Sequence, residues 1–218
     1  MLDAIPLYIC AFCLGSIPSA YIVARVLKDI DLRTVGSGNL GASNIGAQIG
    51  KKWVAPVVLF DLVGKGMSPV LLSQTGVLPY IDGYSVAIAA LISLIGHNWC
   101  CFLKFDGGRG ILVVLGSLAV FEPFFCLVIL ISGLCVWFVT KNVPLSVLIG
   151  LILMPLGAML WNCEYGVVFF TVIAVLLVLA KRILGNRGRK ADCRSTRKVL
   201  VNRILFDRDI SDRLEWIN

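Results

Sequence analysis

Apolar runs and short polar segments alternate along most of this 218-residue chain. A helix needs about 20 apolar residues to cross the roughly 30 Å hydrocarbon core of a bilayer. The runs that are predicted as membrane spans cover residues 4–27, 53–78, 83–103, 111–121, 123–139, 143–161 and 164–180. The pattern predicts an all-α integral membrane protein, built as a bundle of about seven transmembrane helices.

The fourth run, 111–121, is short for a membrane span. It can form a half-helix, or it can join 123–139 as one long span kinked at Pro123, so five to seven crossings fit the apolar pattern. Seven spans place Lys and Arg on alternate connections only. The connections without Lys or Arg are then 74–82, 122 and 162–164. By the positive-inside rule, this arrangement puts the N-terminus outside and the C-terminus in the cytoplasm.

Composition excludes a water-soluble globular protein and divides the chain into two parts. The chain is 58% hydrophobic and 15% charged, and its mean hydropathy is +0.90, so polar surface could not cover it in water. Much of the net charge of +7 lies in residues 181–218, which hold 11 Lys and Arg against 5 Asp and Glu. We therefore expect a membrane-embedded domain over 1–185 and a basic cytoplasmic tail over 186–218.

The tail carries an apolar stripe that is predicted to lie on one side of a helix. The stripe consists of Leu200, Ile204, Phe206, Ile210, Leu214 and Ile217. A basic amphipathic helix is attracted to anionic membrane lipids; the simpler alternative is a tail that only fixes the topology. Nucleic acid is not an expected partner, because no aromatic platform accompanies the basic residues.

Three glycine-containing polar islands lie beside the predicted spans, on the predicted cytoplasmic side. They read GSGNLGASN from Gly36 to Asn44, GHNW from Gly96 to Trp99 and GGRG from Gly107 to Gly110. Glycine lets successive backbone N–H groups converge on an oxyanion, and Asn and Ser add donors without adding charge. A plain turn-forming loop is the alternative for the first island alone. Three such islands on one side favour a phosphate-binding site.

Charged and titratable residues accompany these islands. Asp61 and Lys65 are four residues apart in the second span, so their side chains share one helix face. They form either an ion pair that holds the bundle together or a site that attracts an anionic substrate. Lys104 and Arg109 add positive charge at the third island, and the only histidine, His97, is a core residue, a contact in the site wall or a general base. The eight cysteines form no metal-ligand pattern, so neither a metal nor a cofactor is expected.

The order of several motifs resembles the acyl-phosphate:glycerol-3-phosphate acyltransferases, the PlsY family. The motifs are G-S-I-P from Gly15, D-x-R at Asp31, the first island, Asp61 with Lys65 and Gly66, the second and third islands, and R-x-x-x-N-x-x-R from Arg182 through Asn186 to Arg189. The resemblance implies a seven-span bundle in the cell membrane with its active site at the cytoplasmic face. It also implies transfer of a fatty acyl group from acyl phosphate to the 1-hydroxyl of sn-glycerol 3-phosphate, which releases phosphate and lysophosphatidate as the first step of phospholipid synthesis.

The resemblance further implies which residues act on the two anionic substrates. The expected catalytic residues are Ser37, Asn39, His97, Lys104 and Arg109. The expected substrate-binding residues are Gly36, Gly38, Gly41, Ser43, Asn44, Lys65, Asn98, Gly107, Gly108, Ser146, Arg182 and Asn186. The expected partners are acyl phosphate, glycerol 3-phosphate, membrane lipids and the enzyme that produces acyl phosphate. Because an acyl phosphate is already activated, positioning and charge neutralisation suffice without a covalent intermediate.

Some positions depart from the family's pattern. Ser43 replaces a Thr and Arg109 replaces a Lys, which keeps the hydroxyl and the charge, while Gly64 is an additional residue between Asp61 and Lys65. Ala47 stands where members of the family carry an arginine that binds the acceptor phosphate. An acceptor-altered or non-catalytic paralogue is therefore an alternative. A small membrane transporter is another, although the two halves of the chain do not match each other.

Overall fold

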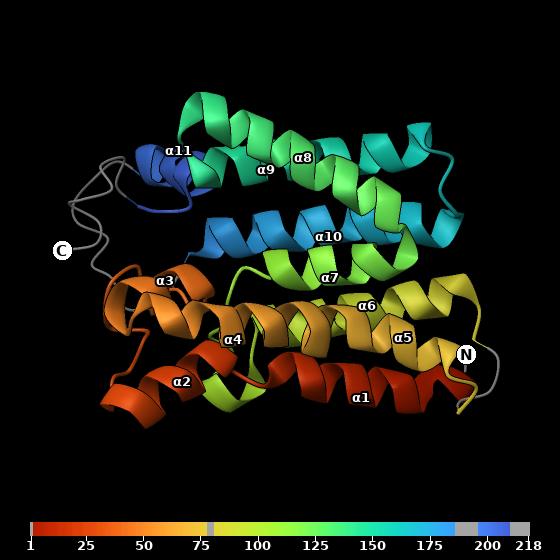
Figure 1. Cartoon of the computed structure of the whole chain (residues 1–218), viewed down its shortest axis with the longest axis horizontal. Helices are drawn as coiled ribbons and strands as arrows, with labels where there is room; N and C mark the ends of the chain where they lie inside the picture. Colours follow the sequence, from red (N-terminus) through yellow and green to blue (C-terminus); the bar gives the residue numbers. More distant parts are fainter. Residues whose placement is uncertain (1, 78–80, 186–195, 210–218) are drawn as a thin grey trace.

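The computed structural model describes residues 2–77, 81–185 and 196–209, and every regular element within these ranges is a helix (Figure 1). In chain order the helices are η1 (Leu2–Ala4), α1 (Ile5–Ser16), α2 (Ser19–Lys28), α3 (Ala42–Gln48), η2 (Lys51–Trp53), α4 (Val54–Leu59), η3 (Phe60–Met67), α5 (Ser68–Gln74), α6 (Gly83–Asn98), η4 (Cys101–Leu103), α7 (Ile111–Phe121), α8 (Pro123–Thr140), α9 (Val143–Leu160), α10 (Tyr165–Leu184) and α11 (Thr196–Phe206).

Six helical segments in the described ranges are long and apolar enough to cross a membrane. They are Ile5–Lys28, Lys51–Gln74, Gly83–Leu103, Pro123–Thr140, Val143–Leu160 and Tyr165–Leu184. The all-α membrane fold is therefore confirmed. The short fourth run forms the eleven-residue α7, about 16 Å long, which the non-helical backbone of Glu122 separates from α8. The fourth and fifth runs thus do not merge into one long span.

Helix α7 is short because the loop before it enters the bundle. All four residues of that loop, from Gly107 to Gly110, are buried. Gly110 precedes α7 with a φ of 75°, in the left-handed region that glycine adopts without a steric penalty. From this inserted loop, α7 runs alongside the longer helices toward the opposite end of the bundle (Figure 1). The third island is therefore part of the interior.

Small residues allow two pairs of helices to pack backbone against backbone. A Cβ atom on Gly66 of η3 would lie 2.6 Å from the carbonyl oxygen of Val113 in α7, and one on Gly116 would lie 2.9 Å from the Cα of Gly66. A Cβ atom on Gly96 of α6 would lie 2.8 Å from the carbonyl oxygen of Phe12 in α1. Such close approach is typical of membrane helices, which pack through small residues.

Helix η3 is a π-helix of eight residues within the second membrane segment. Such helices occur mostly as short insertions in α-helices, often at functional sites. A wider turn accommodates one additional residue, which fits the extra position inferred at Gly64. Asp61 and Lys65 therefore still lie on one face, where their side chains are paired.

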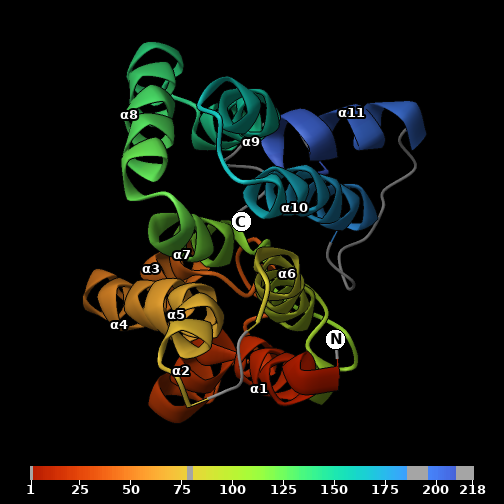
Figure 2. The ribbon, with the colours of Figure 1, turned by 90° about the vertical axis from the view of Figure 1, so that its right-hand side faces the viewer.

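Helices α6, α7 and α10 contribute most of the largest cluster of buried apolar side chains, and α8 lies at the edge of the bundle (Figure 2). Leu94, Leu118 and Phe170 are fully buried in this cluster. Exposed apolar residues of α8 include Leu127, Ile131, Leu134 and Phe138. Without a polar face, α8 is suited to contact lipid rather than water.

Helix α11 belongs to the basic tail and packs against α9 and α10 (Figures 1 and 2). Leu200, Ile204 and Phe206 of the predicted stripe lie in this helix. The remaining positions, Ile210, Leu214 and Ile217, lie outside the described residues. The domain boundary at 185 and the attraction of the tail to lipid stay predictions.

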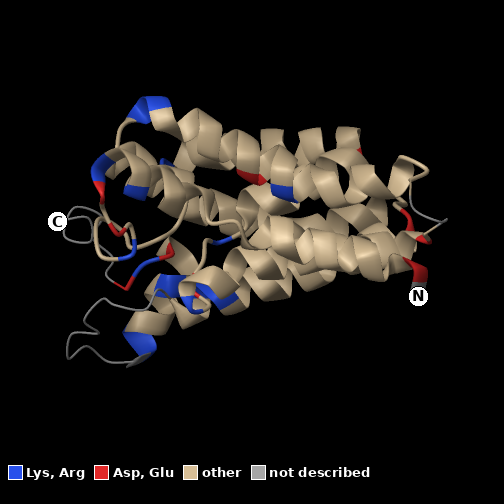
Figure 3. Ribbon diagram, turned by 90° about the horizontal axis from the view of Figure 1, so that it is seen from below, with Lys and Arg blue, Asp and Glu red and all other residues tan. Residues whose placement is uncertain are grey.

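Lys and Arg gather toward the end of the bundle where the C-terminus is drawn, together with some Asp and Glu, whereas the end that holds the N-terminus shows Asp and Glu without Lys or Arg (Figure 3). The polar islands and α11 lie toward the basic end. This distribution is the one that the positive-inside rule associates with a cytoplasmic face. The orientation of the termini nevertheless stays a prediction.

We predict that Gly116→Ala lowers the free energy of unfolding by about 1–3 kcal/mol, because the added methyl group overpacks the contact between α7 and η3. Thermal unfolding in detergent would measure this change. Gly133→Ala is the matched control: it lies in α8, and a Cβ atom there would meet nothing within 4 Å. Equal thermal unfolding midpoints for the two variants would contradict the close packing of α7 on η3.

Candidate active site

The amide group of Asn44 organises the first island. Asn44 is 3% exposed, and its Nδ2 donates hydrogen bonds to the carbonyl oxygens of Leu32, Val35 and Asn39 at 3.1–3.2 Å. Its Oδ1 accepts a hydrogen bond from the N–H of Ser37 at 3.3 Å. Both ends of the amide are therefore used within the loop. Asn44 shapes the island, and its amide is not free for a substrate.

The backbone N–H groups of the first island divide into two sets. Those of Ser37, Gly38 and Asn39 donate to acceptors in the same loop. The next four, from Leu40 to Ser43, donate no such bond within the described part of the chain. Gly36 and Gly38 have φ values of 57° and 66°, which lets the loop turn sharply before α3. The free backbone donors thus lie at the second half of the island, nearer to α3 than the sequence indicated.

Asp61, Lys65 and His97 form a buried cluster between η3 and α6. Lys65 is 1% exposed, and its Nζ lies 2.7 Å from Asp61 Oδ1 and 3.1 Å from His97 Nδ1. Ser19 at the start of α2 donates a hydrogen bond of 2.8 Å to the same Asp61 oxygen. The positive charge of Lys65 is therefore compensated inside the protein, as the ion-pair alternative for this residue proposes.

The contact with Lys65 fixes how His97 is protonated. An ammonium group only donates, so Nδ1 of His97 accepts from Lys65 and the proton of the neutral ring is on Nε2. Nε2 points at the third island, because it is the atom that a Cβ on Gly108 would touch. The ring therefore presents a donor to this loop and no free acceptor. Among the three roles considered for His97, this geometry favours a contact in the site wall.

A small cavity lies where the three islands meet the end of α1. Its lining residues are Gly15, Ser16, Ile17, Pro18, Ser19, Leu40, Lys65, His97, Cys100, Gly107 and Gly108. Ser16 Oγ is buried and has no hydrogen-bond partner within residues 2–77, 81–185 and 196–209. Both amide atoms of Asn98 and the Oδ1 of Asn39 are likewise buried without a partner among the described residues, although neither side chain lines the cavity. Unpaired polar atoms are costly in a protein interior, so these groups are candidates to meet a ligand.

The sequence prediction missed the contribution of residues 15–19 to this cavity. The G-S-I-P motif was visible, but its residues fall within the first apolar run, 4–27, which was read only as a span. The structure breaks that run at Ile17 and Pro18, between α1 and α2. Proline inside an apolar run was the signal that could have indicated the break.

Arg109 is buried beside the cavity but points toward α10 and the tail. It is 8% exposed, and its Nη1 donates a hydrogen bond of 2.8 Å to the carbonyl oxygen of Lys181. Its Nε lies 2.7 Å from Asp207 Oδ1. These two atoms are not aligned as a hydrogen bond, so the contact is an ion pair held by charge alone.

Other predicted site residues lie outside the cavity. Lys104 is exposed at the turn before the third island. Ser146 donates to Val143 within α9, and Arg182 donates to the carbonyl oxygens of Pro144 and Ile204. The predicted positions Asn186 and Arg189 lie outside the described residues.

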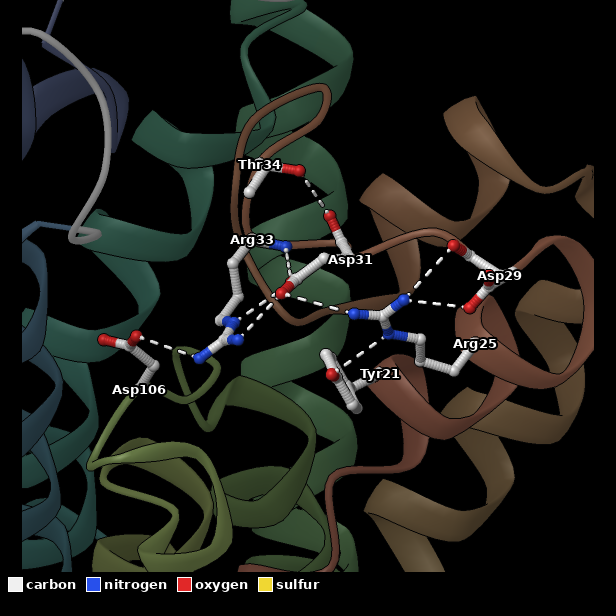
Figure 4. A network of polar contacts seen from close by, with 7 residues as sticks. All are labelled: Tyr21, Arg25, Asp29, Asp31, Arg33, Thr34 and Asp106. Carbon is white, nitrogen blue, oxygen red and sulfur yellow. Dashed lines mark hydrogen bonds and ion pairs between the residues drawn. The ribbon is translucent and has the colours of Figure 1, made fainter.

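A network of ion pairs ties the segment just before the first island to the turn before the third (Figure 4). Arg33 contacts Asp31 at 2.7 Å and Asp106 at 3.6 Å, and Arg25 reaches Asp31 at 3.9 Å. The hydrogen bonds from Arg33 hold the pKa of Asp31 below its usual value, and the same contact raises the pKa of Arg33. Each pair is partly exposed and is worth about 1 kcal/mol or less. The network therefore aligns the two loops more than it stabilises the fold.

Comparison with known proteins agrees with this arrangement. A sequence profile of the glycerol-3-phosphate acyltransferases matches residues 5–188. The chain belongs to this family. It is 32% identical over 216 residues to glycerol-3-phosphate acyltransferase 5 of Dehalococcoides mccartyi (strain ATCC BAA-2266 / KCTC 15142 / 195), with 96% of this chain and 91% of that protein covered. It is 38% identical over 183 residues to a glycerol-3-phosphate acyltransferase of Endomicrobium trichonymphae, with 82% and 88% covered.

Solved structures of the family share the fold. The glycerol 3-phosphate form of PlsY, an integral membrane glycerol 3-phosphate acyltransferase, superimposes with a TM-score of 0.75 at 30% identity and covers 82% of this chain and 88% of its own. The lysophosphatidic acid form gives a TM-score of 0.73 at 28% identity, with 82% and 87% covered. The resemblance to the PlsY family is therefore confirmed.

We predict that Asn44→Ala reduces acyl transfer at least tenfold, because three carbonyl groups and one N–H lose their shared partner and the first island loses its shape. Initial rates in detergent or proteoliposomes would measure the effect. Asp82→Ala is the control: it removes the side-chain cap of α6 at the opposite end of the bundle. Similar losses of activity in both variants would mean that Asn44 supports only general stability.

Proposed function

We propose that this acyltransferase moves a fatty acyl group from acyl phosphate to the 1-hydroxyl of sn-glycerol 3-phosphate. The products are lysophosphatidate and inorganic phosphate, in the first step of phospholipid synthesis. The observation that carries the proposal is the meeting of the three islands at one cavity, in a chain that belongs to the glycerol-3-phosphate acyltransferase family. Family membership also favours an acyltransferase over the small transporter considered from the sequence.

The site supports direct transfer without a covalent enzyme intermediate. Ser19 donates to Asp61 and the Nδ1 of His97 accepts from Lys65, so neither is arranged as a nucleophile with its base. An acyl phosphate brings its own leaving group. The acceptor oxygen bonds to the acyl carbon, the bond from that carbon to the phosphate oxygen breaks, and the released phosphate takes the hydroxyl proton. The protein then has to hold two anions close together.

The free donors of the first island suit the phosphoryl group of the donor. They are the N–H groups from Leu40 to Ser43, with the side chains of Ser37 and Asn39 beside them. Gly107 and Gly108 let the third island approach this loop, since a Cβ on Gly108 would lie 3.0 Å from the carbonyl oxygen of Leu40. The apolar surfaces between the spans would take the acyl chain.

We assign the acceptor, glycerol 3-phosphate, to the side of the site that holds Arg109 and Lys104. Arg109 is the buried cation next to the third island, and Lys104 lies exposed at the same loop. Ala47 is exposed on α3 and supplies no charge. The acceptor phosphate therefore depends on Arg109 and Lys104, and an acceptor other than glycerol 3-phosphate is the alternative that an assay must exclude.

Purified protein mixed with acyl phosphate and glycerol 3-phosphate should release phosphate and form lysophosphatidate, whereas acyl-CoA should not replace acyl phosphate. Asn39→Ala should slow transfer about tenfold or more, because it removes a polar side chain beside the backbone donors proposed to hold the phosphoryl group. Cys13→Ala, on the exposed surface of α1, is the control and should keep full activity. A rate of phosphate release that does not depend on glycerol 3-phosphate would point to a different acceptor. Transfer from acyl-CoA would overturn the donor assignment.

We also propose that the protein lies in the plasma membrane and that its active site faces the cytoplasm. Single cysteines at Lys52 and Val77, both exposed positions at opposite ends of the second segment, would test this in a variant without other exposed cysteines. A reagent that cannot cross the membrane should label position 77 in intact cells and position 52 only after lysis. The reverse pattern would place the site outside.

A further inference from the structure

The tail places a carboxylate on the buried cation of the site. Asp207, which directly follows α11, lies with its Oδ1 2.7 Å from the Nε of Arg109. Asp207 is 98 positions away from Arg109 in the sequence and lies beyond the 5–188 family match. The side chains of Asp207 and Arg109 are 19% and 8% exposed, so water screens the pair only in part. An anionic substrate that used Arg109 would meet this carboxylate first.

Contacts that do not involve Arg109 hold the tail in this position. Arg203 Nη1 donates to the carbonyl oxygens of Ile183 and Leu184 at 2.8 and 3.3 Å, at the end of α10. Arg182 donates to the carbonyl oxygen of Ile204 at 3.0 Å. Arg203 also pairs with Asp209 at 2.6 Å. The position of Asp207 therefore does not depend on its attraction to Arg109.

The backbone conformation of Asp207 does not by itself require an acidic side chain. Its φ is 55°, and its N–H bonds to the carbonyl oxygen of Arg203, which is the left-handed conformation that ends many helices. Glycine and asparagine suit this position best. An aspartate here keeps the turn and adds a negative charge, which contacts Arg109 and also acts on the buried Arg182.

We propose that Asp207 is a specificity-determining residue that competes, as a tethered anion, with the phosphate-bearing substrates for Arg109. This inference rests on the proposed function, in which Arg109 binds a substrate anion. A tethered group acts at a high effective concentration, so weakly held anions do not displace it. A phosphate dianion can, because its oxygens form two aligned charge-assisted hydrogen bonds with a guanidinium, whereas the Asp207 contact is not aligned. The pair thus keeps weakly held anions off Arg109 in the absence of substrate.

The opposite interpretation is that Asp207 positions Arg109 for catalysis. The two interpretations differ in sign. A competitor weakens substrate binding, so its removal lowers the Michaelis constant. A positioning residue supports binding or turnover, so its removal raises the Michaelis constant or lowers kcat.

Asp207→Asn and Asp207→Gly remove the charge and keep a residue that tolerates a positive φ. We expect either change to lower the Michaelis constant for glycerol 3-phosphate about three- to tenfold, the effect of one partly screened charge pair. The dissociation constant of inorganic phosphate, measured by calorimetry, should fall by a similar factor. Asp209→Asn is the matched control, because Asp209 lies in the same segment but pairs with Arg203.

Two other outcomes would overturn the inference. A raised or unchanged Michaelis constant in both Asp207 variants would assign Asp207 a positioning role or no role. Equal effects of Asp207→Asn and Asp209→Asn would mean that only docking of the tail matters. The proposed function can fail separately: if the wild type transfers no acyl group from acyl phosphate while Asp207→Asn alone binds phosphate more tightly, the donor assignment is wrong and the competition for Arg109 stands.

Discussion

A lysine ammonium buried among membrane helices is the constraint on which the arrangement of the site depends. Charge in such an interior is tolerated only where a partner compensates it. Lys65 meets this requirement through Asp61 on the same helix and His97 on α6, and Asp61 in turn accepts from Ser19 of α2. One cluster therefore fixes the relative positions of three helical segments. It also fixes the His97 ring, which forms the wall behind the glycine loop.

Glycine then allows the polar backbone of the third island to pack closely against this cluster. The third island is buried to its last residue, and Gly107 and Gly108 lie so close to the end of α6 and to the first island that no side chain would fit. Beside it, the N–H groups at the start of α3 have no acceptor in the part of the chain that the structure describes. The proposed anion site is thus built mainly from backbone, at the end of the bundle where α10 also buries Lys181 and Arg182.

The cationic part of the site is organised differently, because it involves the tail. Arg109 reaches away from the cavity to the end of α10, where it meets Asp207. A membrane domain and a basic tail that look separate in the sequence therefore share one ion pair. The charge balance at Arg109 is therefore set by two residues that are 98 positions apart in the sequence.

The sequence by itself determined the membrane class, the apolar runs, the one-sided basic residues and the islands, because these follow from local composition and from the length that a bilayer demands. It also indicated the pairing of Asp61 with Lys65, since a four-residue spacing is a local property of a helix. Only the tertiary structure decided that Asn44 shapes its loop, that residues 15–19 line the cavity and that α7 starts from a buried loop. It alone brought Asp207 to Arg109. These features are contacts between segments distant in the sequence, and no local periodicity encodes which distant side chain or carbonyl group will complete a hydrogen bond or an ion pair.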